Sequence, residues 1–197
     1  MRPFLYAVLL VAAFAPGVSA AEIHVMTIGL FAPGLRDLAA TYTKESGTTV
    51  TVKGTVAGSG TITKTGPGTL ALASSASTFS GTWAINDGAL NINDDTNLGA
   101  AGAGLSVSGA TVNVANAWNT SRAIALSGSG MTLNVAADSA LAGVISGAGG
   151  LTKIGSSNVT LSGANTYMGA TTITAGTLTS GAANAIPASS PVLLQGA

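Results

Sequence analysis

The sequence predicts a mainly β protein, built from short strands that turn often and stack on one another. Apolar residues alternate with Thr, Ser and Asn in short runs such as "LSVSGATVNV", and Gly, Asn or Ser interrupts each run. Charged residues make up only 7% of the chain, against about 25% in soluble globular domains. Gly and Thr recur too often for a long helix. The runs therefore suit a coil that turns every few residues and packs on the next coil.

Composition also excludes some classes of function. The 197 residues hold 7 Lys or Arg against 7 Asp or Glu, so the chain has no basic stripe with which to bind nucleic acid. It has no Cys, so an exported form must be stabilised by packing and not by disulfides.

Residues 1–20 predict a secretory signal peptide in a helical form. Arg2 supplies a positive start, residues 4–15 are apolar, and residues 18–20 (Val-Ser-Ala) are small residues suited to a cleavage site. The apolar run has about a dozen residues, whereas a membrane-spanning helix needs about 20. An uncleaved membrane anchor is the alternative interpretation.

Residues 21–53 predict a strand, a helix and a second strand. "EIHVMT" (residues 22–27) has the character of a strand. In "LRDLAATYTKES" (residues 35–46) apolar side chains recur at positions i, i+3, i+4 and i+7, which is typical of one helical face. "TTVTVK" (residues 48–53) alternates as a strand does, and the order indicates a short βαβ unit.

Residues 21–52 resemble the mature N-terminus of periplasmic substrate-binding proteins, particularly the molybdate-binding type. That family implies an oxyanion site at the first turn, where the candidate residues are Thr27 and Gly29 at a helix N-terminus. A plain strand-to-helix turn is the alternative, because one βαβ unit cannot enclose a ligand. The residues that match the family pattern are Leu35, Leu38, Ala39, Tyr42, Lys44, Ser46 and Gly47.

The rest of the chain contains an internal repeat. "ITKTGPGTLAL" (residues 62–72) aligns with "LTKIGSSNVTL" (residues 151–161) at an offset of 89 residues (151 minus 62). "TFSGTWAINDGAL" (residues 78–90) aligns with "TYMGATTITAGTL" (residues 166–178) at an offset of 88 (166 minus 78). The paired residues include Lys64 with Lys153, Gly66 with Gly155, and Gly88 with Gly176.

Both copies resemble the passenger-associated transport repeat of bacterial autotransporters, most closely in "LTK", "SGANTY" and "AGTL" of the second copy. The resemblance implies a right-handed parallel β-helix over residues 54–197. At about 25 residues per coil, we expect roughly six coils, with residues 149–178 forming about one coil and its corners. We expect Leu, Ile, Val and Ala inside, rows of Thr, Ser and Asn outside, and Gly at the corners.

No enzyme site is evident. His24 is the only His and Cys is absent, so nucleophilic catalysis and zinc binding lack residues in the repeat region. Asp94 and Asp95 suggest a calcium site, a carboxylate pair or, as we favour, a solvated turn. The aromatic residues could stack on sugars, but we expect core packing instead; they are Phe79, Trp83, Trp118 and Tyr167.

The function that the resemblance implies is a non-catalytic autotransporter passenger with a stalk or adhesin-type role, exported to the cell surface, the outer membrane or the medium. The implied partners are the outer-membrane translocation machinery or a separate C-terminal β-barrel, and a host or cell-surface ligand; no cofactor, metal or nucleic acid is expected. Because the chain stops within a repeat, we expect a fragment or a gene fusion. The alternatives are a truncated or fused periplasmic solute-binding protein and a β-helical polysaccharide lyase or hydrolase.

Overall fold

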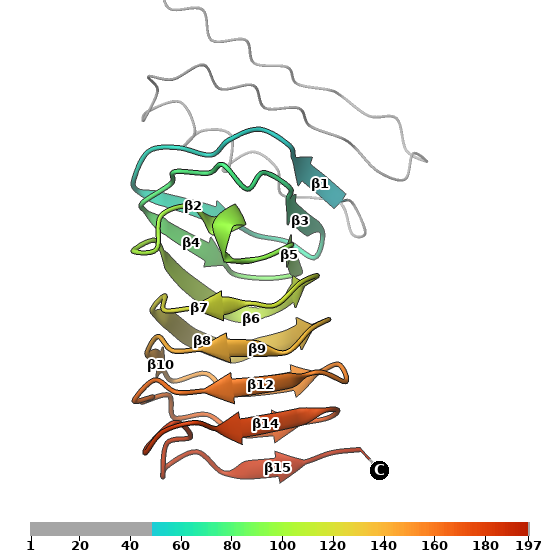
Figure 1. The fold of residues 1–197 in the computed structure, drawn as a ribbon, viewed down its shortest axis with the longest axis vertical. Coiled ribbons are helices and arrows are strands. Elements are labelled where there is room, and N and C mark those ends of the chain that lie inside the picture. The colour runs from blue at the N-terminus through green and yellow to red at the C-terminus, as the bar shows by residue number, and fades with distance from the viewer. Residues whose placement is uncertain (1–48, 197) are drawn as a thin grey trace, which may run out of the picture.

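The computed structural model describes residues 49–196, and these residues form one column of stacked parallel strands (Figure 1). Every strand pairing in the column is parallel. The predicted signal peptide and most of the predicted βαβ unit, including Thr27 and Gly29, lie outside the described residues. The strands are β1 (Thr49–Val52), β2 (Thr61–Lys64), β3 (Thr69–Leu72), β4 (Thr82–Ile85), β5 (Ala89–Ile92), β6 (Gly104–Val114), β7 (Asn119–Thr120), β8 (Ile124–Val135), β9 (Ser139–Leu141), β10 (Ile145–Gly147), β11 (Leu151–Ile154), β12 (Asn158–Leu161), β13 (Thr171–Ile173), β14 (Thr177–Ser180) and β15 (Val192–Leu194), with one 3-10 helix, η1 (Asp95–Leu98).

One side of the column, which we call the ladder face, runs the length of the described chain. It consists of β1, β3, β5, the C-terminal halves of β6 and β8, then β11, β13 and β15. Residues in register on successive coils are 49, 69, 89, 111, 132, 152, 172 and 193, so each coil takes 20 to 22 residues and the ladder makes seven turns. The expectation of six coils of about 25 residues is therefore wrong, and residues 149–178 exceed one coil. The coil is shorter because most strands have only three or four residues and tight turns join many of them.

Two further faces flank the ladder face. The first flanking face contains β2, β4, the N-terminal halves of β6 and β8, and β10. The second flanking face contains β7, β9, β12 and β14. The strands β6 and β8 run continuously from the first flanking face onto the ladder face, bending at Gly109 and at Gly128 and Gly130, which have positive φ.

The strand alternation predicted from the sequence sets the inside and the outside of the column. In β5 and in the C-terminal half of β6, every second residue is buried, and the residues between them lie half-buried on the outer surface. Leu90, Val112 and Leu133 stack in register inside the column at 0% exposure. Each such side chain contributes about 1.5–3 kcal/mol of burial free energy, and each coil covers the apolar side of its neighbour.

The aromatic residues are part of this core, as expected. Phe79, Trp83, Trp118 and Tyr167 are at most 2% exposed, and the rings of Phe79 and Trp83 meet edge to face at 5.1 Å. The Trp83 indole N–H donates to the Leu98 carbonyl at 3.0 Å. The alternative interpretation, sugar stacking by these rings, is wrong because no ring face is open to solvent.

The solenoid also includes the strand predicted at residues 48–53. Thr49–Val52 pairs in parallel with Thr69–Leu72, so the first described strand belongs to the ladder face although the sequence assigns it to the βαβ segment. The column thus begins upstream of the expected boundary at Gly54.

Candidate functional site

The two neighbouring aspartates do not form a carboxylate pair. Asp94 caps η1, where its side chain accepts from the Thr96 N–H at 2.9 Å. Asp95 faces the other way and accepts from Arg122 Nε at 2.8 Å and from the Trp118 indole N–H at 3.0 Å. The solvated turn that we favoured thus describes Asp94, whereas Asp95 is 24% exposed and ion-paired. Within residues 49–196 no group of three or more His, Cys, Asp or Glu residues could hold a metal ion.

Arg122 is the centre of a polar cluster that the sequence did not predict. It is 2% exposed, and besides its ion pair with Asp95 its guanidinium donates to four backbone carbonyls. The acceptors are the carbonyls of Asp95 at 3.1 Å, Gly99 at 2.7 Å, Ala100 at 2.5 Å and Ala103 at 3.0 Å. The guanidinium therefore holds the irregular segment 95–103, which contains η1, against the column. The only sign of this cluster in the sequence is a single Arg in a charge-poor region.

Each repeat copy places a buried lysine at a corner of the column, an arrangement that we call a lysine corner. Lys64 Nζ donates to the Gly66 carbonyl of its own turn at 2.7 Å and to the Asp87 carbonyl of the next coil at 2.9 Å. Lys153 Nζ likewise donates to the carbonyls of Gly155 and Ala175, both at 2.9 Å. Each ammonium group thus joins two stacked turns. In the sequence these lysines stand out only as matching positions of the two copies.

Burial changes the electrostatics of the lysine corners. Lys64 is 9% exposed and Lys153 0%. Desolvation lowers the pKa of both lysines below the usual value, and the negative charges of Asp87 and Asp138 oppose that shift for Lys64 and Lys153 respectively. Carbonyl dipoles, and not a directly contacting carboxylate, therefore satisfy the ammonium groups.

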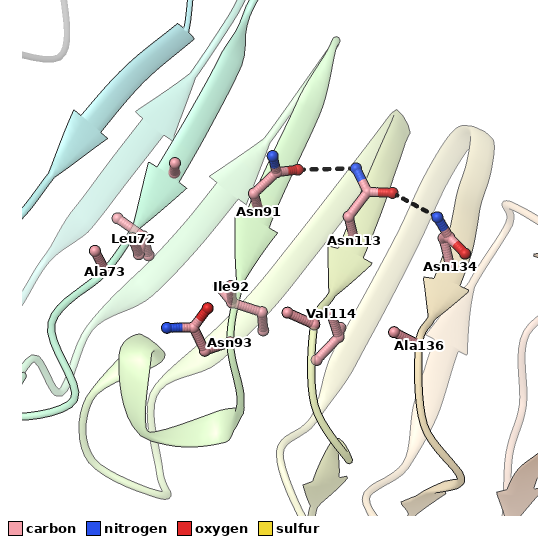
Figure 2. A pocket seen from close by; sticks show the side chains of 11 residues that line it. Leu72, Ala73, Asn91, Ile92, Asn93, Asn113, Val114, Asn134 and Ala136 are labelled. Carbon is pink, nitrogen blue, oxygen red and sulfur yellow. Dashed lines mark hydrogen bonds between the residues drawn. The ribbon is translucent and has the colours of Figure 1, made fainter. Parts of the chain in front are cut away.

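A row of three amides crosses the ladder face (Figure 2). Asn113 Nδ2 donates to Asn91 Oδ1 at 2.8 Å, and Asn134 Nδ2 donates to Asn113 Oδ1 at 3.1 Å. These residues come from β5, β6 and β8 on successive coils, in direct register. The expected rows of outward Asn residues are confirmed. The sequence signal for this row is an Asn between two apolar residues ("LNI", "VNV", "LNV") that recurs about once per coil.

A shallow groove of about 380 Å³ follows this row, and we call it the asparagine groove. Most of its lining residues are Asn or Ala, and no charged side chain lines it. Four small residues lie beside the amides: Ala71, Ala73, Ala115 and Ala136.

In the part of the chain that the structure describes, no helix is long and apolar enough to cross a membrane.

Comparison with known proteins supports the internal repeat found in the sequence. The family description "Passenger-associated-transport-repeat" matches residues 62–92 and 151–179. Residues 62–92 and 151–179 carry this passenger repeat, which supports an autotransporter passenger. The chain is also 42% identical over 129 residues to the adhesin BmaC autotransporter of Brucella suis biovar 1 (strain 1330). The aligned part covers 65% of this chain and 4% of that relative, so the chain spans only a small part of the relative's length.

No solved structure matches the chain at a significant level. Neither match to known proteins supports the resemblance of residues 21–52 to solute-binding proteins. The oxyanion site expected at Thr27 and Gly29 lies outside the described residues and gains no support from the comparisons.

Proposed function

We propose that this passenger segment is a non-catalytic, surface-exposed spacer with an adhesin-type role, exported through the outer membrane as part of a longer protein. The observation that carries the proposal is the continuous column itself: seven stacked turns share one apolar core. Within residues 49–196, no buried side-chain polar atom lacks a hydrogen-bond partner. Such a column keeps its two ends a fixed distance apart, as a stalk must.

The use of charge also supports a structural role. In addition to Arg122 and the lysine corners, Asp87 accepts from the Gly88 N–H at 2.6 Å and Asp138 from the Asn158 N–H at 2.8 Å. Each charged side chain from residue 64 to residue 153 makes a hydrogen bond within the column. Most of these charged groups thus fix a turn or join two coils, whereas an acid–base enzyme would direct some of them into a common cleft.

Surface display tests the proposal. The full chain would be expressed in a Gram-negative host, placed upstream of an autotransporter translocator barrel, with a barrel-less version as the control. We expect antibody labelling on intact cells only when the barrel is present. Added protease should leave a resistant fragment that begins near residue 49. Retention in the periplasm, or rapid digestion of residues 49–196 at the surface, would contradict the proposal.

Calorimetric titration of the full chain with molybdate tests the alternative function. We expect no saturable heat, because the proposed column relies on stacking and not on ligand closure. Micromolar binding would favour the solute-binding interpretation.

A further inference from the structure

We propose that the asparagine groove is a binding site for a neutral, hydroxyl-rich polysaccharide, which would lie across the coils along the row of amides. The inference rests on the proposed surface location, because only a displayed passenger segment would meet a glycan of another cell or of a matrix.

The row of amides has hydrogen-bonding capacity left over. Each side-chain amide has two N–H donors and an acceptor oxygen, but Asn113 and Asn134 each use only one N–H within the row. The row is also polarised. Its end at Asn91 presents both N–H groups, and its end at Asn134 presents a carbonyl oxygen, none of which has a partner within residues 49–196.

Asn93 extends this set of polar groups. It is exposed, it lines the groove, and its side-chain amide makes no hydrogen bond within residues 49–196 (Figure 2). A sugar hydroxyl both donates and accepts, so neighbouring hydroxyls can pair with the N–H and the oxygen of one amide. Amides open to solvent therefore match a polyol better than they match an apolar or ionic ligand.

The shape of the groove suits a repeating polymer. Successive Asn residues lie on adjacent parallel strands, which are about 4.8 Å apart, so the same donor and acceptor recur at one spacing. The alanines beside the row carry only a methyl group, which leaves room for a sugar ring to approach the amides. Ala73, Ala115 and Ala136 are exposed and Ala71 is half-buried.

Other classes of ligand fit less well. Nucleic acids and acidic glycans require Lys or Arg, and none lines the groove. A peptide added as a strand requires a free sheet edge, whereas β5, β6 and β8 are each paired on both sides along the ladder face. A membrane surface requires exposed apolar side chains, but the larger apolar residues of the groove, Leu72, Ile92 and Val114, are at most 3% exposed.

We expect weak binding of short ligands and stronger binding of polymers. The aromatic residues are buried, so the groove lacks the stacking platform that raises affinity for sugars. A polymer engages several coils at once and gains from the increased effective concentration. Hexasaccharides should therefore bind with dissociation constants of about the millimolar range, weaker than a polymer of the same sugar.

The test is a titration of the isotopically labelled full chain, followed by amide chemical shifts, with cellohexaose and mannohexaose as probes. Asn113→Ala removes the central amide, and Ala115→Leu fills the groove at an exposed position while leaving the row of amides intact. Asn158→Ala is the matched control, because Asn158 also accepts a hydrogen bond from the next coil, at 2.8 Å from Thr179, but lies on the second flanking face. We expect shifts at residues 91–93, 113–115 and 134–136. Each groove variant should weaken binding at least tenfold, and the control less than twofold.

Three results would overturn the inference: no saturable shift with either hexaose, unchanged binding in both groove variants, or binding only of a heparin-derived hexasaccharide or a peptide. Thermal unfolding of each variant shows whether a loss of binding reflects a loss of fold, and Ala115→Leu remains informative if Asn113→Ala is unstable. Surface display is measured in a separate experiment, by antibody labelling of intact cells. A displayed chain without glycan binding contradicts only this inference, whereas a chain that is not displayed contradicts the proposed function.

Discussion

The two repeat copies have similar sequences but lie on different faces of the column. The first strand of the first copy, β2, lies on the first flanking face, whereas its equivalent in the second copy, β11, lies on the ladder face. The turn after Lys64 therefore joins the first flanking face to the ladder face. The turn after Lys153 joins the ladder face to the second flanking face. One motif forms two different corners.

The copies lie on different faces because the offset between them does not equal a whole number of coils. Thr69 and Thr152 share one row of the ladder face four coils apart, which corresponds to 83 residues (152 minus 69). The repeat copies are instead offset by 89 residues (151 minus 62). The first strand of the second copy therefore lies on the face that the second strand of the first copy occupies. The repeat thus encodes a strand–turn–strand corner with its lysine, and the total chain length before it decides which corner it forms.

In the region between the copies, a buried cation also satisfies clustered backbone carbonyls, but the cation is an arginine. The Arg122 guanidinium donates to the carbonyls of the irregular segment 95–103, whereas in each repeat copy a lysine ammonium donates to the carbonyls of a glycine-containing turn. The comparison indicates that each corner with clustered carbonyls requires a buried cation. The following predictions test that rule, in order of decreasing effect.

Replacement of Arg122 should have the largest effect. Arg122→Ala removes the ion pair of the partly buried Asp95 carboxylate, which keeps only the Trp118 N–H, and takes one donor from each of four carbonyls. We expect a loss of about 4 kcal/mol in unfolding free energy. Arg122→Lys should recover only part of this loss, because an ammonium cannot reproduce the planar set of donors. Urea denaturation of the full chain measures both. Equal stability of Arg122→Ala and the unmodified chain would refute the role of the cluster.

The lysine corners should differ in strength. Lys153→Met keeps the apolar stem but removes the ammonium, and we expect a loss of about 3 kcal/mol because two carbonyls lose a charged donor. Lys64→Met should cost about 2 kcal/mol, since Lys64 is less deeply buried. Hydrogen exchange at the adjacent turns localises each effect. If both variants are as stable as the unmodified chain, the carbonyls of the stacked turns do not require the lysines.

Gly88 and Gly176, which lie on the next coil against the two lysines, should be nearly as sensitive to substitution as the lysines. Gly88 and Gly176 have φ of +68° and +69°. An added Cβ at Gly88 would lie 2.3 Å from the Gly68 carbonyl oxygen and 2.7 Å from Lys64 Nζ. One at Gly176 would lie 2.6 Å from both the Gly155 carbonyl oxygen and Lys153 Nζ. We expect Gly88→Ala and Gly176→Ala to cost about 2 kcal/mol each, from the sum of backbone strain and crowding. Gly58→Ala is the control, because its φ is +99° but nothing lies within 4 Å of an added Cβ. A loss in the control that equals the others would show that crowding against the lysine and the carbonyls of the stacked turn has no effect.

The smallest effect is a dependence of stability on pH. Burial lowers the pKa of Lys64 and Lys153 in the folded state, so the unfolded chain binds more protons as pH approaches the unfolded value of about 10.5. Stability should therefore rise slightly with pH over that interval. Burial raises the pKa of Tyr167, which has the opposite effect above about pH 10. Thermal unfolding between pH 7 and 9.5 should show the rise, and the double variant Lys64→Met/Lys153→Met should lack it.

The sequence alone determined the alternation of inward and outward residues, the positions of the corners and the passenger repeats. These features are local: an alternating run such as residues 110–114 presents its apolar side to any core, and Gly88 or Gly176 permits a positive φ wherever its turn lies. Only the tertiary structure decided which faces the two copies occupy, that Asn91, Asn113 and Asn134 form one row, and that Arg122 reaches segment 95–103. Those relations depend on the exact length of every coil between the partners. A difference of one or two residues per coil, which alternation does not reveal, changes the alignment of everything that follows.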